Sequence, residues 1–306
     1  QNIPLPSGRN YQQMFVAIPG FSPPADASSI PGNPSRALQV NVNGTTSNSA
    51  VTRIDGASST NVFMNMVSAY VPALESIETV NVVTNSFDAE QGLAGGAAIN
   101  VQIKSGTNQL HGSAFEYHTN NKLKAKPFFS PPGERKAKSI MNQFGGTLGG
   151  PIRKNELFYF VSYEGTYNHQ FAAKYQTVPT AAIKSGNMSA SPSEIYDPRT
   201  GFSDGSGRTP FPGKQIPSSR IDPIAKKIAD LTPLPTYPNL LTSNYYAGKP
   251  FYFDRNTVDS KINWNASRKL SMYGRYSFLK FDSIAPPTFG DELGGDAISG
   301  ANVGHG

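Results

Sequence analysis

A regular alternation of apolar and polar residues is the feature that most constrains the fold of this sequence. It is clearest at residues 257–264, where Val258, Ile262 and Trp264 lie on one side of the alternation and Asp259 and Lys261 on the other. Successive side chains of a β-strand point to opposite faces, so this pattern predicts a strand with one apolar face. The same alternation recurs at residues 111–119, 157–164 and 270–280.

The lengths of these runs and of their connectors favour a membrane barrel. A tilted transmembrane strand needs about 9–11 residues, and outer-membrane barrels alternate short periplasmic turns with longer extracellular loops. Here the connectors 121–138 and 171–254 are long, whereas 149–156 and 265–269 are short. A secreted β-sandwich explains the alternating residues but not the alternating connectors. We therefore expect the two long connectors on one side of a barrel wall and the two short ones opposite.

A barrel wall also presents one continuous apolar band to lipid. This predicts that the apolar positions of three runs share one face of the sheet. They are Leu157, Tyr159, Val161, Tyr163, Val258, Ile262, Trp264, Met272, Tyr276 and Phe278.

The residues before Gly106 predict a smaller unit of α+β type. Residues 1–38 read as irregular. Strand-like runs at 39–42 and 50–54 flank Asn43-Gly44, which favours a hairpin turn. Residues 77–84 and 97–104 predict two further strands, and residues 61–70 a short helix. We expect these strands to form one sheet that is separate from the later strands.

The composition limits the chemistry of the chain. It has no cysteine, which excludes disulfides, thiolate metal sites and a cysteine nucleophile. Its 29 Gly, 25 Pro, 14 Tyr and 18 Phe fit a β-rich chain with many turns. The net charge of +6 is accompanied by no nucleic-acid-binding motif. The missing motif argues against a nucleic-acid partner, and the four histidines are scattered, so we expect no metal site. No catalytic constellation occurs in the sequence, so we expect no cofactor and no enzymatic activity.

Several segments resemble the plug domain of TonB-dependent outer-membrane receptors. The series begins with an Asp-Gly turn after Ile54, continues with Ile-Glu-Thr-Val-Asn-Val at 77–82 and Gly-Gly-Ala-Ala-Ile-Asn-Val at 95–101, and ends with Lys-Ser-Gly-Thr-Asn at 104–108. The resemblance identifies these plug-motif residues: Asp55, Gly56, Glu78, Gly92, Gly95, Gly96, Asn100 and Lys104.

The flanking segments are similar to the Oar-like branch of this family. Residues 5–10 resemble the opening of its plug, and residues 111–115, 142–146, 149–152 and 158–165 resemble its first barrel strands. The family's barrel has about 22 strands, and we count about five here. We therefore expect a fragment without the N-terminal coupling segment and without a signal peptide.

The resemblance implies a mainly β fold: a small α+β plug domain at 1–108, followed at 109–306 by an incomplete antiparallel transmembrane β-barrel wall with extracellular loops near 121–138 and 171–254. It implies TonB-energised uptake of an unidentified ligand across the outer membrane of a Gram-negative bacterium. The implied partners are outer-membrane lipid and a periplasmic TonB-type energy-coupling protein. A secreted β-rich adhesion or carbohydrate-binding protein is the alternative, and a hydrolase would need two carboxylates that converge in a cleft. Candidate contacts for ligand or lipopolysaccharide are Lys122, Lys124, Lys126, Arg135, Lys136 and Lys138.

Overall fold

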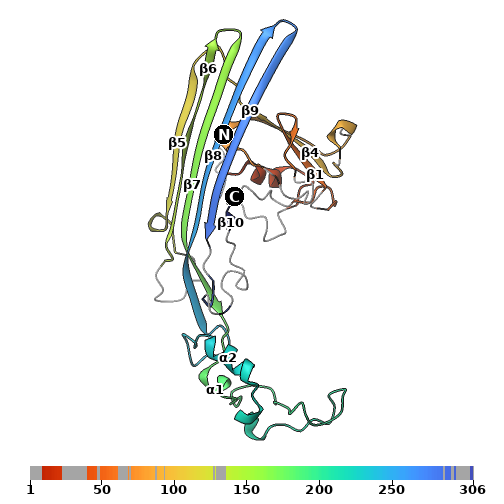
Figure 1. Cartoon of the computed structure of the whole chain (residues 1–306), viewed down its shortest axis with the longest axis vertical. Helices are drawn as coiled ribbons and strands as arrows, with labels where there is room; N and C mark the ends of the chain where they lie inside the picture. Colours follow the sequence, from red (N-terminus) through yellow and green to blue (C-terminus); the bar gives the residue numbers. More distant parts are fainter. Residues whose placement is uncertain are drawn as a thin grey trace.

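The computed structural model describes residues 9–22, 40–46, 49–60, 68, 70–86, 88–92, 94–126, 128, 136–284, 287–290, 293 and 304–305. These residues form two β-sheets (Figure 1). One has four strands in the order β2-β1-β4-β3, and the other has six in the order β10-β9-β8-β7-β6-β5. The predicted fold class is confirmed: the chain is mainly β, and its larger, antiparallel sheet is not closed into a barrel.

The six-stranded sheet, here called the wall, runs up and down through strands that pair with their neighbours in the sequence. Its edges are β5 and β10, and no ladder joins them among the described residues. The strands are β5 (His111–Asn120), β6 (Ser139–Arg153), β7 (Leu157–Gln176), β8 (Tyr245–Ser267), β9 (Leu270–Ile284) and β10 (Gly304–His305).

The wall strands extend further than the alternation of residues predicted. β7 and β8 pair without interruption from Leu157 opposite Trp264 to Gln176 opposite Tyr245. The loop predicted at 171–254 is therefore 177–244, and the turn predicted at 149–156 shrinks to 154–156 because β6 continues to Arg153. Backbone hydrogen bonding does not require an apolar face, so a ladder continues after the apolar residues that signal it have ended.

The predicted arrangement of the connectors is confirmed. The described residues of connector 121–138 lie at the same end of the wall as connector 177–244, and the turns 154–156 and 268–269 lie at the other end (Figure 1). The long connector holds only the short helices α1 (Ala181–Lys184) and α2 (Pro223–Leu231) and two 3-10 turns, η5 (Pro212–Lys214) and η6 (Ser218–Arg220). It contributes no residue to the hydrophobic core cluster, also as predicted. A further 3-10 turn, η4 (Asn121–Leu123), opens the shorter connector.

The four-stranded sheet is separate from the wall strands, as expected. β1 pairs in parallel with β4, which pairs antiparallel with β3. We call this sheet, with the 3-10 helices around it, the N-terminal layer. Its elements are η1 (Tyr11–Ala17), β1 (Ala50–Ile54), β2 (Ala57–Ser58), η2 (Leu74–Ser76), β3 (Ile77–Val83), η3 (Ala89–Gln91) and β4 (Ala97–Ile103).

The prediction of a hairpin around Asn43-Gly44 is wrong. Asn43 and Gly44 do form a turn with positive φ angles of 50° and 76°, but Val42 bridges to Phe21 and not to β1. Instead, Asp55 and Gly56, with φ of 48° and 83°, turn β1 directly into β2. A two-residue hairpin turn of this kind needs two positive φ angles, which both dipeptides tolerate.

Two further predictions concern segments that are only partly described. Residues 1–38 were expected to be irregular, yet residues 11–17 form the 3-10 helix η1, whose N-cap Asn10 accepts a hydrogen bond from the Gln12 N–H at 2.9 Å. The helix expected at 61–70 lies outside the described residues except for positions 68 and 70.

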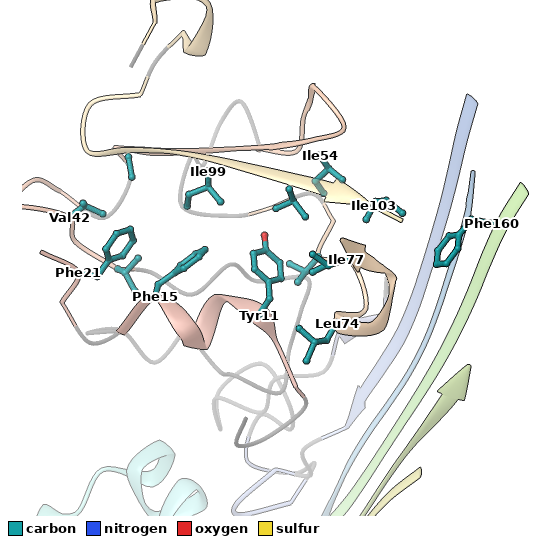
Figure 2. Close-up of a cluster of buried hydrophobic side chains, with 14 residues drawn as sticks. Tyr11, Phe15, Phe21, Val42, Ile54, Leu74, Ile77, Ile99, Ile103 and Phe160 are labelled. Carbon is teal, nitrogen blue, oxygen red and sulfur yellow. The ribbon is translucent and has the colours of Figure 1, made fainter. Parts of the chain in front are cut away.

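The hydrophobic core lies between the four-stranded sheet and η1, and it reaches the wall. Tyr11 and Phe15 of η1 pack edge to face, with ring centroids 5.8 Å apart. Figure 2 shows Phe160 of β7 approaching the cluster from the wall near Ile103. Phe160 is 1% exposed, so the N-terminal layer and the wall share one core.

Candidate functional site where the two sheets meet

The two faces of the wall differ in polarity. In the β-ladders Tyr163 lies opposite Val258, which lies opposite Phe278, and Leu157 lies opposite Trp264. Directly opposed residues of antiparallel strands share a face, so the predicted apolar band is confirmed as one continuous face. Much of it is exposed: Val161, Tyr163, Ile262, Trp264, Met272, Tyr276 and Phe278 are 38–67% exposed.

The opposite face of the wall is polar, and the N-terminal layer covers it. Glu164, Arg255, Asp259 and Lys261 are each at most 7% exposed, although each carries an ionisable side chain. Such residues are almost never fully buried unless they are paired. An apolar exterior around a polar interior is the reverse of a soluble protein and is typical of outer-membrane barrels.

The tip of the β1–β2 hairpin is bound to the wall through Asp55. The Lys261 ammonium donates to Asp55 Oδ1 at 3.1 Å and to the Ile103 carbonyl at 3.0 Å. Arg275 Nε lies 3.5 Å from the other carboxylate oxygen, and the Tyr273 hydroxyl donates to the Asp55 carbonyl. We call Asp55, Lys261, Tyr273 and Arg275 the Asp55 clamp.

The Asp55 clamp fixes the position of the hairpin tip on the wall more than it adds net stability. Burying an ion pair gains little net stability, because desolvation offsets the attraction, whereas removing one partner of a buried pair costs about 3–5 kcal/mol. The side chain of Asp55 is 6% exposed and that of Lys261 is 8% exposed. The Asp55-Gly56 turn also points the carboxylate at the Ile103 N–H, 3.1 Å from Oδ1. The clamp therefore penalises any other placement of the hairpin tip on the wall.

A second contact joins the N-terminal layer to β5. Arg9 Nη2 donates to Glu75 Oε1 at 2.7 Å. The Arg9 guanidinium lies 4.4 Å from the ring centroid of Tyr117 and 5.0 Å from that of Phe115, both on β5. Cation–π contacts strengthen when the cation is desolvated, and Arg9 is only 7% exposed. This group is called the Arg9 contact.

Between these two contacts lies a pair formed within the wall. Arg255 Nη2 donates to Glu164 and, at 3.2 Å, to Thr166 Oγ1. Glu164 also interacts electrostatically with Arg9 and Glu75. The Glu164–Arg255 pair of the wall therefore interacts with the charged residues of the Arg9 contact.

Tyr70 contributes a phenol to this surface. Its hydroxyl lies beside Asp259 and Ser277 without a well-formed hydrogen bond. Burial raises the pKa of Tyr70, and the adjacent Asp259 carboxylate raises it further. The phenol consequently stays protonated, as a donor facing a buried carboxylate.

Half of the plug-motif residues come together in one place. Asp55, Gly56, Glu78 and Asn100 line a single polar cleft that also reaches Lys261 of the wall. Glu78 is exposed on β3, and Asn100 of β4 lies between β1 and β3.

The remaining plug-motif residues take part in turns and backbone hydrogen bonds of the N-terminal layer. Gly92 ends η3 with φ of 71°. The N–H groups of Gly95 and Gly96 both donate to the Ser49 carbonyl, and a Cβ at Gly96 would lie 2.7 Å from the Ser49 hydroxyl. The Lys104 N–H donates to the Ser76 carbonyl at 2.9 Å. The Thr45 and Ser49 hydroxyls leave little room for a side chain at position 96, which explains the glycine there.

The glycine-rich stretch 145–150 lies inside β6 and forms no turn. A Cβ at Gly145 would come within 2.1 Å of the Tyr163 carbonyl oxygen on the neighbouring strand. Close approach of the neighbouring strand therefore accounts for the glycine at position 145.

The sequence-based prediction missed most of the contact surface. It did not single out Arg9, Glu75, Glu164, Arg255, Asp259, Lys261 or Arg275. A signal was present, because Asp259 and Lys261 occupy the positions that alternate with Val258 and Ile262 in the same strand. Charged residues facing away from the lipid side face the lumen of a barrel.

The basic connector is placed at the end of the wall that carries the long loops. Lys122, Lys124, Lys126, Lys136 and Lys138 are exposed, and the Lys136 ammonium donates to the Lys124 carbonyl at 2.8 Å. Arg135 lies outside the described residues. No group of three His, Asp or Glu side chains suited to a metal ion occurs in the part of the chain that the structure describes. Within the same residues, no helix has both the length and the hydropathy to span a membrane.

Comparisons with known proteins agree with this geometry. The family model described as "Outer membrane beta barrel domain" matches residues 102–305, about two thirds of the chain. Over 147 residues, 46% of the chain, the sequence is 29% identical to the TonB-dependent transporter Oar of Myxococcus xanthus, of which it covers 14%. This relative is a transporter, in line with the expectation of no enzymatic activity.

One solved outer-membrane transporter shares the fold of this chain. The outer membrane transporter YddB from Escherichia coli superposes with a TM-score of 0.52 at 12% identity, covering 93% of this chain and 32% of its own. The siderophore receptor PirA from Acinetobacter baumannii gives 0.46 at 16% identity, covering 92% and 30% respectively. The chain thus spans less than a third of the length of these solved proteins.

Proposed function

Since this chain belongs to the outer-membrane β-barrel domain family, we propose that residues 1–108 form a plug seated on the first part of a barrel wall, residues 109–306. The family places the protein in the outer membrane. In this proposal the intact protein takes up a ligand through the barrel, and movement of the plug opens the path. The similarity to a TonB-dependent transporter supports a periplasmic TonB-type protein as the source of energy.

The observation that carries the proposal is the opposite polarity of the two wall faces. Ile262 and Trp264 expose an apolar surface, while Asp259 and Lys261, in alternate positions of the same strand, are buried under the N-terminal layer. A secreted adhesion protein gains nothing from this arrangement, because water would meet its apolar face. A lipid-embedded wall with a polar lumen requires it.

The loops at the far end of the wall are the proposed place of ligand contact. The connector 177–244 extends beyond the strands, and the basic connector carrying Lys122, Lys124 and Lys126 lies at the same end. Exposed lysines suit an anionic ligand or the phosphates of lipopolysaccharide. The eight plug-motif residues act in this proposal by shaping and seating the plug, through the cleft at Asp55 and through the backbone at Gly96 and Lys104.

A test of the plug needs no knowledge of the ligand. The full-length protein and a variant lacking residues 1–108 are inserted into planar lipid bilayers, and their ion conductance is compared. We expect the full-length protein not to conduct ions and the deletion variant to conduct them, because removal of the plug leaves the polar lumen of the barrel open. A deletion variant that keeps the heat-modifiable mobility of a folded barrel yet does not conduct would contradict the proposal.

The energy-coupling partner is tested separately. The periplasmic domain of a TonB-type protein from the same organism is titrated into the purified full-length protein, and a variant that lacks the N-terminal coupling segment serves as control. Binding that depends on the coupling segment is expected. Equal binding to both proteins, or to neither, would remove this partner from the proposal.

A further inference from the structure

The two short turns of the wall are rich in basic residues. The end of β6 and the turn after it supply Arg153 and Lys154, and the turn after β8 supplies Arg268 and Lys269. All four residues are exposed. Glu156 is the only acidic residue in the two turns and in the three positions on either side of each. We call Arg153, Lys154, Arg268 and Lys269 the basic rim.

The two turns lie side by side and form one surface. The N–H of Asn265, near the end of β8, donates to the Glu156 carbonyl of the other turn at 2.8 Å. The Asn155 N–H donates to Asn108 Oδ1, and Asn108 Nδ2 donates to Asn155 Oδ1, both at 2.7 Å. Figure 1 shows both turns at the end of the wall away from α1 and α2. The backbone that carries the basic rim is therefore held from two sides.

The basic rim borders the apolar band. Arg153 lies opposite Leu157 in the β6–β7 ladder, and opposed residues share a face. Leu157 belongs to the band, so Arg153 lies on the lipid-facing side as well. Trp264 and Leu270 are exposed on this face beside the rim, and the Trp264 indole N–H donates to Glu156 Oε1 at 3.4 Å. A tryptophan and basic side chains at the edge of an apolar surface are typical of a membrane–water interface.

The charge of the basic rim is only partly neutralised. Arg153 Nη1 lies 2.9 Å from Glu156 Oε2. Within the described part of the chain, Lys154, Arg268 and Lys269 form no ion pair. Cations held on adjoining turns repel one another, and an anion bound between them removes this repulsion.

The position of the rim identifies the anion. Short turns of outer-membrane barrels lie on the periplasmic side, where the leaflet consists of phospholipids with their phosphates at the level at which an apolar band ends. Arginine binds phosphate through two parallel hydrogen bonds, and lysine adds a compact positive charge. We propose that the basic rim binds the phosphate groups of anionic phospholipids, such as phosphatidylglycerol, in the inner leaflet of the outer membrane.

A phospholipid fits both parts of this surface at once. Its phosphate meets the basic rim while its acyl chains pack against Leu157, Trp264 and Leu270. A free anion uses only the charge, and it gains less because exposed charges are screened by salt. Bound lipid fixes the depth of the turns in the membrane. The inference goes beyond uptake and needs no movement of the plug.

The experiment uses the full-length protein in bilayers of phosphatidylcholine that contain a brominated lipid, either phosphatidylglycerol or phosphatidylcholine. Bromine quenches tryptophan fluorescence at short range. Each protein is compared with its own Trp264→Phe version, so the difference reports lipid beside Trp264. The ratio of the two quenching curves gives the affinity for phosphatidylglycerol relative to phosphatidylcholine.

Three sets of variants are compared with the wild-type protein. The rim variant replaces all four residues of the basic rim with Gln, and two half variants replace the pair on one turn only. A charge-preserving variant carries Arg153→Lys and Arg268→Lys. The matched control replaces four exposed basic residues of the long connector with Gln, which changes the net charge equally; they are Arg199, Arg208, Lys226 and Lys227.

We expect the wild-type protein to prefer phosphatidylglycerol by at least about threefold, because basic residues close to a membrane attract anionic lipid. The ratio should fall to about one in the rim variant and to intermediate values in the half variants. The control and the charge-preserving variant should keep the wild-type ratio. Raising the salt from about 0.1 M to 1 M should lower the ratio in the wild-type protein.

A wild-type ratio near one, or a ratio that survives in the rim variant, overturns the inference. Loss of the ratio in inorganic phosphate, but not in chloride of equal ionic strength, overturns it in favour of a site for free phosphate. If the rim variant lacks the heat-modifiable mobility of a folded barrel, the half variants decide in the same way. Neither conductance nor partner binding enters the measurement, so this inference and the proposed function fail independently.

Discussion

Lys261 of β8 donates a hydrogen bond to Asp55 at the tip of the β1–β2 hairpin, although 206 positions separate the two residues in the sequence. The same carboxylate lies near Arg275 and accepts from the Ile103 N–H. A single acidic side chain thus joins the hairpin tip, the end of β4 and two wall strands. This concentration of contacts makes Asp55 the residue whose loss should most loosen the N-terminal layer from the wall.

Asp55→Asn should weaken this attachment. The substitution keeps the shape of the side chain but leaves Lys261 buried without a counter-charge, and we expect a cost toward the lower end of about 3–5 kcal/mol. Hydrogen exchange of the full-length protein should accelerate at residues 50–58, and brief conductance openings should become more frequent. Asp88→Asn, at an exposed position of the same layer, is the control. Equal hydrogen-exchange rates at residues 50–58 in the two variants would show that the Asp55 clamp does not attach the layer to the wall.

Arg9→Gln should loosen the layer on the side of β5. It removes the ion pair with Glu75 and both cation–π contacts, each of the latter contributing about 0.5–2 kcal/mol. We expect faster exchange in η1 and at residues 74–76, and increased accessibility of Tyr117 to surface labelling. Arg199→Gln, at an exposed position in the long connector, serves as control. Unchanged labelling of Tyr117 would show that the aromatic pair does not hold Arg9.

Two exposed isoleucines should tolerate replacement by lysine to different degrees. Ile262 is 51% exposed in the apolar band, and Ile224 is 70% exposed on α2 beyond the wall. A lysine at the middle of the lipid-facing surface costs about 2–4 kcal/mol. We therefore expect Ile262→Lys to reduce the amount of folded, heat-modifiable protein in outer membranes and Ile224→Lys to leave it unchanged. Equal loss from both variants would argue against a lipid-facing band.

The long connector should lose order in strong acid through Asp197. Arg220 donates to both of its carboxylate oxygens, and the Arg199 N–H donates to Oδ1 at 2.9 Å. The hydrogen bonds from Arg220, followed by that from the Arg199 N–H, lower the pKa of Asp197 from 3.8 to about 2. A folded-state pKa below the unfolded value means that this stabilisation is complete above pH 3.8 and is lost as the pH falls through about 2.

The measurement is hydrogen exchange at residues 195–211 across this pH range. The wild-type protein should show a loss of protection as the pH approaches 2, after correction for intrinsic rates. Asp197→Asn should show weaker protection that does not change in this window. Arg220→Gln should show weaker protection with a smaller loss in acid, because only the Arg199 N–H then lowers the pKa of Asp197. A transition that persists in Asp197→Asn would assign the pH dependence to another group.

Much of the wall was predictable from sequence, and for a simple reason. The polarity of each strand face depends on alternate residues along one strand, so Val258, Ile262 and Trp264 reveal their common face without knowledge of any partner. The ends of the strands were less predictable. At Gln176 and Tyr245 the ladder continues after the apolar signal has faded, because only backbone groups are needed to extend it.

Only the tertiary structure decided how the N-terminal layer is built and how it is attached. Asn43-Gly44 and Asp55-Gly56 carry equally good turn signals, and the choice between them depends on β1 pairing with β4, whose residues come more than forty positions later. Likewise, nothing near Arg9 in the sequence indicates Phe115 and Tyr117 as its partners. Local patterns determine what one strand presents on each face. Contacts between Asp55 and Lys261 depend on the relative placement of two sheets, which is a property of the whole packed chain.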